Sequence, residues 1–361
     1  MYTPLQNIAD LSLRELQAAM TALGEPAYRA RQLHHWLFSR HASGFAEMTT
    51  LPAPLREKLC RSFSLLKPEV AACTETNEDA CELPTGKILL KLPDGETVES
   101  VLIATPERMT ACVSSQVGCP LQCTFCATGR MGLHRNLNSS EITWQVHVLN
   151  ELAASKKPGA AITNVVFMGM GEPLLNTENV FEAVENLSRR NYSPNLSQRR
   201  ITISTVGIVP EIARLAKSGL KTKLAVSLHA ARQDKRLALM PVAAARYPLD
   251  ELRSSLASYA AATGLPVTLV YMLLKGINDS PEDARHLAGF AKSFLCKINL
   301  IDFNANINIK FSPANRAARD MFAGHLVESG LHVTVRKSYG TAINAACGQL
   351  ATTGIPDRNN F

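Results

Sequence analysis

Three cysteines lie close together in the segment Cys119-Pro-Leu-Gln-Cys123-Thr-Phe-Cys126, and their thiols could bind a metal. Thiolates are soft ligands that favour iron–sulfur clusters, zinc or copper. A structural zinc site has four ligands in closed tetrahedral geometry, whereas the nearest further cysteine, Cys112, lies seven residues before Cys119 on an expected strand. Cubane iron–sulfur clusters usually take four cysteines. Three cysteines without an obvious fourth predict a cluster with one open iron, where a substrate can bind.

Two other interpretations of these cysteines stay open. A free cysteine is often a buried structural residue, although three at this spacing on one loop speak against that role. The second alternative is a zinc site, because a short motif alone does not identify the metal.

The composition bounds the answer. The chain has 361 residues, enough for a large catalytic domain and a small accessory one. Apolar residues make up 46% and charged residues 19%, so a sizeable core is expected rather than wholesale disorder. The net charge of +7 suits a polyanionic partner, although many enzymes carry as much.

The sequence gives no sign of a membrane or secretory segment. No apolar stretch approaches the roughly 18 residues of a membrane-spanning helix, and the first residues carry acids where a signal peptide is apolar. We therefore expect a cytoplasmic protein that does not associate with a membrane. In that compartment its nine cysteines are not expected to form a disulfide scaffold.

The chain up to about Pro68 predicts three helices. Apolar residues recur at helical spacing over 11–23, and further helices are expected at 28–36 and 55–63. Six basic or histidine side chains gather in this region: Arg29, Arg31, His34, His35, Arg40 and His41. On composition a solvated helix face explains them. An RNA-contacting surface, whose cations displace counterions from phosphates, is the sharper alternative.

Beyond Lys87, strand-like and helix-like runs alternate. The segments 87–92 and 97–103 flank Pro93-Asp94-Gly95 and predict a hairpin. Further strands are expected at 163–168, 200–204, 223–229, 267–273, 297–303 and 331–335. Helices expected between them include 177–190, 210–218, 248–263 and 281–294. This alternation predicts parallel β–α–β units, in a partial barrel or a doubly wound sheet, with the active site at the carboxyl ends of the strands.

Together with other segments, the cysteine motif resembles a known family. Its spacing, with the aromatic Phe125 before the last cysteine, is similar to the signature of the radical S-adenosylmethionine superfamily. Five more segments resemble the RlmN/Cfr family of RNA methyltransferases: Cys112–Cys119, Met168–Pro173, Ser204–Gly207, Ser227–His229 and Ala345–Leu350. The resemblance covers about 99–350 and implies an α/β fold, a partial (β/α) radical-SAM barrel with a small N-terminal helical domain. We expect residues 1–85 to form that accessory, RNA-binding domain, 86–350 the catalytic core and 351–361 a C-terminal tail.

The resemblance also implies the chemistry. One [4Fe-4S] cluster would be held by Cys119, Cys123 and Cys126, and its open iron would bind the amino and carboxylate groups of S-adenosylmethionine. Two molecules of S-adenosylmethionine are implied for each methylation. The first gives a methyl group to Cys347, and the second, cleaved at the cluster, gives a 5′-deoxyadenosyl radical that activates it. After the carbon joins adenine, Cys112 attacks Cys347, which leaves a disulfide and frees the base.

Further roles follow from the same resemblance. Glu99 matches the family's proposed proton acceptor, with an exposed strand glutamate as the alternative. Contacts to S-adenosylmethionine are implied for Gly171, Glu172, Ser204, Ser227, Leu228, His229 and Asn304. The segment 302–315 departs from the proline- and glycine-rich family pattern close to Asn304. Cysteines that match no family role, and are expected to be structural, are Cys60, Cys73, Cys81 and Cys296.

The sequence thus predicts a methyltransferase that modifies C2 of an adenosine in 23S ribosomal RNA, with transfer RNA as a further candidate. Within the family the alternative is the Cfr-type methylation of C8, which gives antibiotic resistance, and 126–129, 206–210 and 246–248 look Cfr-like. A non-catalytic RNA-binding protein stabilised by zinc is the alternative from another class. We expect a monomer that depends on a cellular one-electron reductant.

Overall fold

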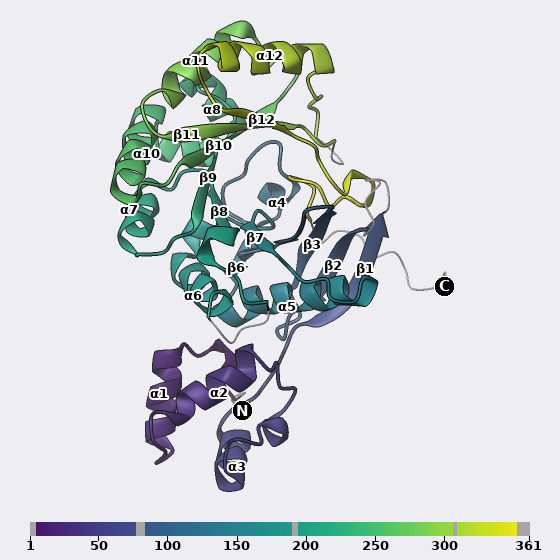
Figure 1. The fold of residues 1–361 in the computed structure, drawn as a ribbon, viewed down its shortest axis with the longest axis vertical. Coiled ribbons are helices and arrows are strands. Elements are labelled where there is room, and N and C mark those ends of the chain that lie inside the picture. The colour runs from purple at the N-terminus through teal and green to yellow at the C-terminus, as the bar shows by residue number, and fades with distance from the viewer. Residues whose placement is uncertain (1–4, 77–83, 190–193, 306–308, 352–361) are drawn as a thin grey trace.

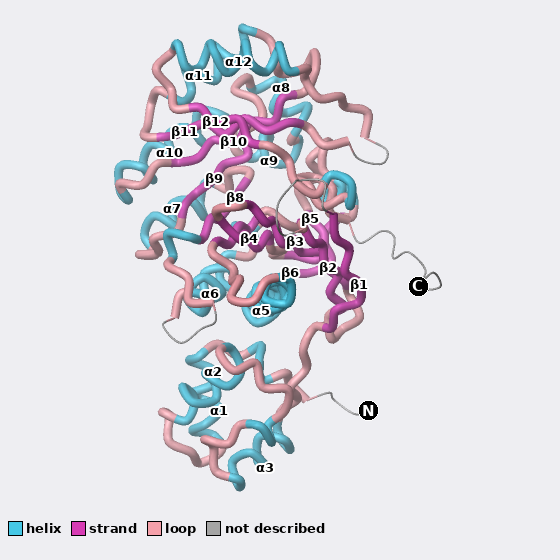
Figure 2. Tube along the Cα trace, turned by 45° about the vertical axis from the view of Figure 1, so that its right-hand side comes forward, coloured by secondary structure: helices cyan, strands magenta, loops and turns pink. Residues whose placement is uncertain are grey.

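The computed structural model describes residues 5–76, 84–189, 194–305 and 309–351. Helices at the start of the chain form a small body at one end of the molecule, and the rest forms a curved sheet with helices outside it (Figure 1). The helices of the small body are α1 (Leu13–Ala22), α2 (Arg29–Phe38) and α3 (Ala53–Ser62). Figure 2 shows this body set apart from the sheet and joined to it by the segment that leads into the first strand.

The sequence explains where α1 begins. The hydroxyl of Ser12 accepts a hydrogen bond from the backbone N–H of Glu15 (3.3 Å), and the Glu15 carboxylate accepts one from the N–H of Ser12 (2.8 Å). This capping box satisfies two donors that the first turn of a helix leaves unpaired. Leu16 and Met20, one turn apart, are fully buried, so one face of α1 packs into the small body.

A single large sheet is the frame of the second part. Within the described residues it has ten strands in the order β1-β2-β3-β4-β7-β8-β9-β10-β11-β12. They are β1 (Glu69–Thr76), β2 (Thr85–Lys91), β3 (Thr97–Thr105), β4 (Arg108–Cys112), β7 (Asn164–Phe167), β8 (Ile201–Thr205), β9 (Lys223–Ser227), β10 (Val267–Leu273), β11 (Cys296–Asp302) and β12 (Val333–Arg336). Strands β1 to β4 pair antiparallel, and from β4 onward each neighbouring pair is parallel. The parallel part sets the carboxyl ends of its strands along one edge.

Helices cover the outer, convex side of the sheet, and a loop fills its inner side (Figure 1). The outer helices are α5 (Ser139–Lys156), α6 (Thr177–Leu187), α7 (Val209–Lys217), α10 (Leu249–Thr263), α11 (Pro281–Ala291) and α12 (Arg316–Glu328). Shorter helices are α4 (Ala127–Arg130), α8 (Gln233–Leu239) and α9 (Pro241–Arg246). A separate antiparallel pair, β5 (Gln116–Cys119) and β6 (Gly132–Asn136), carries the cysteine loop and α4 between its strands.

The predicted α/β fold is confirmed, and each strand and helix predicted beyond residue 85 is present with small shifts at its ends. The prediction missed β1, which lies inside the range 1–85 but pairs with β2 in the large sheet. The helical body therefore ends before residue 69. Of the expected tail 351–361, residues 352–361 lie outside the described part of the chain. Among the described helices, none combines the length and apolar character needed to cross a membrane.

Two histidines join the helical body to the large part. His34 is buried and its Nε2 lies 3.1 Å from Oδ1 of Asn186 on α6. The ring of His41 stacks on His147 of α5 at 3.6 Å between centroids and meets Trp144 edge-on. Burial lowers the pKa of both, His34 to about 4 and His41 to about 3, so both are neutral at pH 7. Both side chains are engaged between the two parts of the molecule, so a solvated helix face does not describe them.

Candidate active site

A pocket with a volume of about 160 Å³ opens inside the curve of the sheet. The carboxyl ends of five parallel strands line it, through Phe167, Met168, Ser204, Ser227, Met272 and Ile301 among others. Strand alternation explains how they reach it. In β9, Leu224 and Val226 are fully buried, whereas Ser227 lies on the opposite face and borders the pocket.

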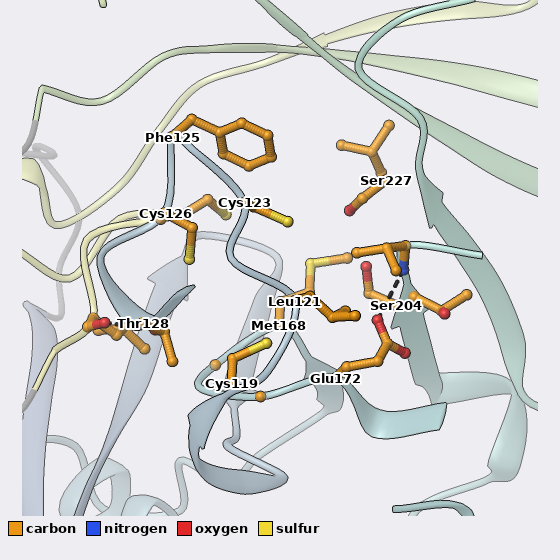
Figure 3. Close-up of a pocket in the computed structure, with 18 of the residues that line it drawn as sticks. Cys119, Leu121, Cys123, Phe125, Cys126, Thr128, Met168, Glu172, Ser204 and Ser227 are labelled. Atoms are coloured by element: carbon orange, nitrogen blue, oxygen red, sulfur yellow. Dashed lines mark hydrogen bonds between the residues drawn. The ribbon is translucent and has the colours of Figure 1, made fainter. Parts of the chain in front are cut away.

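Cys119, Cys123 and Cys126 line the pocket from one loop, and Figure 3 shows their sulfur atoms directed into it. Cys119 and Cys123 are buried, Cys126 is half-buried, and all three are free thiols. No three Cys, His, Asp or Glu side chains in the described ranges are grouped closely enough to hold one metal ion. Three thiols on one loop, with no further donor grouped with them in the described ranges, fit a cluster with one open iron better than the four-ligand site of a structural zinc ion.

The cysteine loop is held at both ends. Gly118, at φ +77°, precedes the first cysteine, and a Cβ there would overlap the carbonyl oxygen of Gly132, so the position requires glycine. Thr124 donates hydrogen bonds from its N–H (3.0 Å) and its hydroxyl (3.1 Å) to the carbonyl of Leu239, the last residue of α8. The loop is thus fastened to β6 on one side and to α8 on the other.

Glu172 lies across the pocket from the cysteines (Figure 3) and is 2% exposed. Its Oε1 accepts a hydrogen bond from the N–H of Leu174 and its Oε2 from the N–H of Val206, both at 2.9 Å. Gly171 turns the chain into this position at φ +96°, and a Cβ there would lie 2.5 Å from Cβ of Gln116. Burial raises the pKa of Glu172 to about 7. The carboxylate has no ion-pair partner among the described side chains, so a ligand cation could supply one.

His229 forms another wall with its ring edge-on to Phe125, 4.8 Å between centroids. Its Nδ1 accepts a hydrogen bond from the N–H of Met272 at 3.1 Å. Burial lowers the pKa of His229 to about 3, and the nearby Arg236 charge acts in the same direction. The ring is therefore neutral and carries its proton on Nε2, where it can donate to a ligand.

The segment with Cys347 closes the pocket beside the cysteine loop. Cys347 itself is a lining residue and accessible to solvent. The N–H of Ala127 donates to the carbonyl of Gly348 (2.8 Å), and the hydroxyl of Thr128 donates to the carbonyl of Leu350 (2.6 Å). These two bonds bring together residues more than 200 positions apart in sequence.

Two amide side chains hold the same segment from the other side. Gln349 donates to the carbonyl of Ala305 at 2.7 Å and accepts from the N–H of Ala346 at 3.0 Å. Asn304 donates to the carbonyl of Cys347 at 3.3 Å. Asn304 is 8% exposed and is not among the lining residues, so in this structure it contacts the Cys347 backbone rather than the pocket.

Cys112 ends β4 next to Cys347. It is 7% exposed, and burial raises the pKa of its thiol, with the proximity of Cys347 raising it further. Protein atoms crowd around Cys347 although solvent reaches it, and this crowding raises the pKa of its thiol, while the charge of Arg336 opposes the shift. The two cysteines, 235 positions apart in sequence (347 − 112), therefore lie close enough in the fold for their charges to interact.

Glu99 is 5% exposed on β3, so the alternative of an exposed strand glutamate was wrong. Its Oε1 lies 3.0 Å from Nζ of Lys87, and its Oε2 accepts from the N–H of Ala351 at 2.9 Å. Burial raises the pKa of Glu99, and the bond and charge of Lys87 oppose that shift. Glu99 does not line the pocket but binds the backbone that follows the lining residue Leu350.

The remaining residues assigned from the sequence differ in where the structure places them. Leu228 is fully buried, and its side chain does not line the pocket. Of the cysteines expected to be structural, Cys60 and Cys73 are exposed, Cys296 is half-buried and Cys81 lies outside the described residues. Lining residues that the sequence reasoning missed include Thr128, Met168, Val206, Met272 and Ile301. The predicted strand ends were the available signal, because several of these residues end a parallel strand or follow it.

Comparison with known proteins decides the family. The family model of the radical SAM superfamily matches residues 113–288, and that of the ribosomal RNA large subunit methyltransferase N-terminal domain matches residues 6–65. A protein of Pelodictyon phaeoclathratiforme, named "Probable dual-specificity RNA methyltransferase RlmN", is 64% identical over 350 residues, 97% of this chain and 98% of that protein. The chain belongs to the RlmN family.

Other relatives of RlmN type agree with this assignment. A protein with the same name from Chlorobaculum tepidum is 55% identical, over 97% of this chain and 94% of its own length. The crystal structure of a radical SAM methyltransferase from Sphaerobacter thermophilus is similar at a TM-score of 0.86 and 40% identity, covering 96% of this chain and 99% of that one. Both the predicted family and the predicted radical-SAM fold are thereby confirmed.

An RlmN-family pocket has to accommodate a [4Fe-4S] cluster and S-adenosylmethionine, and the residues present suit both. Three thiols face the pocket from one side. A buried carboxylate without a cation among the described side chains, Glu172, faces it from the other. A ligand with an ammonium group between the two would complete the charge balance.

Proposed function

We propose that this RlmN-family enzyme methylates C2 of an adenosine in 23S ribosomal RNA, and also acts on transfer RNA, through a methylated Cys347. One observation carries the proposal. Cys347 lies on the pocket shared by Cys119, Cys123 and Cys126, and Cys112, far away in sequence, lies beside it. A structural role for each cysteine alone gives no reason for this convergence. The named relatives are of RlmN type, which favours C2 over the C8 alternative.

The cluster with S-adenosylmethionine, when bound, supplies radical chemistry that can functionalise an electron-poor ring carbon. Cys119, Cys123 and Cys126 would hold it, and Glu172 would bind the methionine ammonium. Ser204, Ser227 and His229 line the same pocket and offer hydroxyl and Nε2–H donors.

The roles of the remaining residues follow from their positions. Cys347, accessible in the pocket, would receive the methyl group from one S-adenosylmethionine, while a second is consumed in activating it. Glu99 would take the ring proton after the carbon has joined adenine, reaching it beside the Leu350 backbone. The Cys112 thiol would then give up its proton and bond to the sulfur of Cys347 as the bond from that sulfur to the new carbon breaks, and the released carbon would take up a proton to become the methyl group. Burial raises the pKa of Cys112, so at neutral pH its thiol keeps its proton until this step.

The partners follow from the same reaction. The target adenosine has to leave its stack to reach the pocket, as is usual for enzymes that modify a base. The helical body, with the rest of 1–85, would bind the RNA around it, while 86–350 performs the chemistry. We propose a monomer that works in the cytoplasm, where its RNA substrates are found, and that receives electrons from a cellular one-electron reductant. The disulfide left between Cys112 and Cys347 has to be reduced before the next turnover.

The test compares Cys347→Ala with Cys112→Ala, each purified from cells that contain RNA. Cys347→Ala should accept no methyl group and modify no RNA. Cys112→Ala should still add the carbon to adenine but should fail to release it. We expect a protein–RNA adduct through Cys347, seen as a band on a denaturing gel that disappears on ribonuclease treatment.

Two further readouts separate the alternatives. Iron and sulfide in anaerobically purified protein support the enzyme, whereas a colourless zinc protein supports the non-catalytic RNA-binding alternative. Mass spectrometry of RNA nucleosides distinguishes 2-methyladenosine from 8-methyladenosine. Normal turnover of Cys112→Ala with no RNA-linked band would overturn the proposed route, because a purely structural cysteine gives modest destabilisation and no adduct.

A further inference from the structure

Arg236 on α8 is a fully buried arginine next to the candidate active site. Its Nη2 donates to the carbonyl of Val206 at 2.7 Å, and its Nη1 donates to the carbonyl of Tyr247 at 3.3 Å. Its Nε has no hydrogen-bond partner among the residues that the structure describes. Burial lowers its pKa to about 10, which still leaves the guanidinium charged at neutral pH.

This charge is not balanced by the described chain. No carboxylate of the described residues lies within ion-pair distance of Arg236, whereas Arg232 on the same helix pairs with Asp234 and Glu282. A buried charge is strongly unfavourable unless an opposite charge and hydrogen bonds compensate it. Two neutral carbonyls give only part of that compensation, so an anion is missing from the surroundings of Arg236.

The nearest candidates for that anion are the cluster cysteines. The carbonyl of Leu239, one turn after Arg236 on α8, accepts both hydrogen bonds of Thr124, the residue after Cys123. Cys123 packs in the same apolar cluster as Leu239 and Met240. These contacts hold the end of α8, one turn from Arg236, against the cysteine loop.

The second buried charge of the site makes the arrangement complementary. Glu172 accepts from the N–H of Val206 while Arg236 donates to the carbonyl of the same residue, so the two charges flank one backbone unit without pairing. Glu172 faces the pocket opposite the cysteines (Figure 3), whereas Arg236 lies behind its wall. Among the described residues, Glu172 thus has no cationic partner, and Arg236, on the cysteine side, has no anionic one.

We propose that Arg236 is a positioning residue of the electrostatic kind: its buried guanidinium is the counter-charge of the three-thiolate cluster and raises the cluster's reduction potential. The inference rests on the proposed cluster at Cys119, Cys123 and Cys126. Reduction adds a negative charge to a centre that already carries three thiolates, and a fixed cation nearby favours that step. The effect acts through space, because Arg236 does not line the pocket and so cannot contact S-adenosylmethionine.

The alternative role of Arg236 is a clamp for the carbonyls of Val206 and Tyr247. Three variants separate the effect of the charge from the effect of the two hydrogen bonds. Arg236→Met removes both, Arg236→Gln removes the charge but can still donate one hydrogen bond, and Arg236→Lys keeps the charge on a different donor geometry. Arg232→Met is the matched control, because it removes the half-buried arginine at the N-cap of α8, which has its own carboxylate partners.

The measurement is the midpoint potential of the reconstituted cluster in the full chain, followed by its electron paramagnetic resonance signal, with iron and sulfide content determined for each sample. We expect a more negative potential in Arg236→Met and Arg236→Gln, a potential close to the wild type in Arg236→Lys, and no change in Arg232→Met. Thermal unfolding of the cluster-free proteins is the second readout. There, Arg236→Met should be at least as stable as the wild type, because it removes an uncompensated charge.

Each outcome of these measurements supports or overturns the inference. Full iron content with an unchanged potential in Arg236→Met and Arg236→Gln would overturn the inference and leave the proposed function intact. An Arg236→Lys potential as negative as that of Arg236→Met would assign the residue to the carbonyl clamp. If neither Arg236→Met nor Arg236→Gln folds without the cluster, Arg236 is likewise assigned to the carbonyl clamp. A wild-type protein that takes up no iron and sulfide would overturn the proposed function, and this inference with it.

Discussion

At the scale of single residues, Glu172 shows how the fold prepares a charge for a ligand. The carboxylate is 2% exposed, and both oxygens accept backbone N–H groups at 2.9 Å. These bonds orient it but do not offset burial, which raises its pKa from 4.5 to about 7. The side chain is therefore only partly ionised near neutral pH in the protein without ligands. A bound ammonium group would favour the ionised form.

This environment predicts a pH dependence for Glu172. Between about pH 4.5 and 7 the folded protein holds a proton that the unfolded chain has released, so the free energy of unfolding falls as pH rises through this range. The shift corresponds to a loss on the order of 3 kcal/mol by pH 7 and above. Glu172→Gln should flatten this part of the stability profile, measured by denaturant unfolding of the cluster-free protein at several pH values.

Binding should show the opposite trend. The affinity of the wild type for S-adenosylmethionine should rise as pH increases through about 7, because the ionised carboxylate forms there. Glu172→Gln should bind about tenfold or more weakly at pH 8, since a charge-assisted bond is lost. Glu178→Gln, at an exposed position of α6, is the control. A Glu172→Gln protein with wild-type affinity would remove this residue from the binding site.

Residues differ in how well the sequence foretold them. The cysteine motif pointed to the pocket because its spacing restricts the chemistry, whereas Glu172 followed from the family resemblance, in the loop after the predicted strand 163–168. Arg236 gave no signal, since nothing in a short helix distinguishes a buried arginine from a solvated one. Asn304 was expected at the ligand, but its amide binds the Cys347 carbonyl. Such a partner, 43 positions away, is set by tertiary packing.

At the scale of elements, the Cys347 segment depends on its attachments rather than on regular structure. It contains a short 3₁₀ turn (Thr341–Ile343) and no strand or α-helix after β12 within the described residues. Its position comes from side-chain and backbone bonds to three places: α4, the segment after β11, and β3 through Glu99. Such a segment can be loosened without disturbing the sheet.

Gln349 offers a test of this attachment. Its side chain is 5% exposed and bonds to Ala305 and Ala346, so Gln349→Ala leaves the buried N–H of Ala346 unpaired, at about 1–3 kcal/mol. We expect methylation of Cys347 to slow roughly tenfold to a hundredfold, measured by mass spectrometry of the peptide that carries Cys347. Cluster content should remain normal. Asn150→Ala, which removes the acceptor of the Ile162 N–H far from the pocket, should leave the rate unchanged.

Helices and strands with a clear pattern of apolar residues were predictable from the sequence, and those without such a pattern were not. Strands such as β10, which is apolar apart from Thr268 and has all seven residues buried, were found at their true bounds. The exposed strand β1 was missed because its acids and threonines show no apolar alternation, and it forms by pairing with β2. The pair β5 and β6 was missed for a similar reason, since β6 has no buried residue.

At the scale of the whole molecule, the helical body is attached to the large part by a neutral, buried contact. Two of the side chains first considered for RNA are engaged within the protein, because His34 contacts Asn186 and His41 stacks on His147. Arg29 is also engaged, because it donates to Gln32 at 2.7 Å. The exposed cations that remain of the six are Arg31 and Arg40. These two are therefore the better test of RNA binding by this body.

We predict that Arg31→Gln with Arg40→Gln weakens RNA binding and reduces its salt dependence. Each RNA phosphate that the protein no longer neutralises should lower the slope of log K against log salt by roughly 0.7–0.9, so two such phosphates should lower it by about 1.5. Cleavage of S-adenosylmethionine without RNA should be unaffected. The control is Arg253→Gln with Arg316→Gln, which removes the same charge from exposed positions on α10 and α12. If both double variants change the slope equally, the helical body contributes only net charge, and the proposal that it places the RNA is overturned. If only the Arg31 and Arg40 variant reduces the slope, RNA binding is assigned to the domain that precedes the sheet.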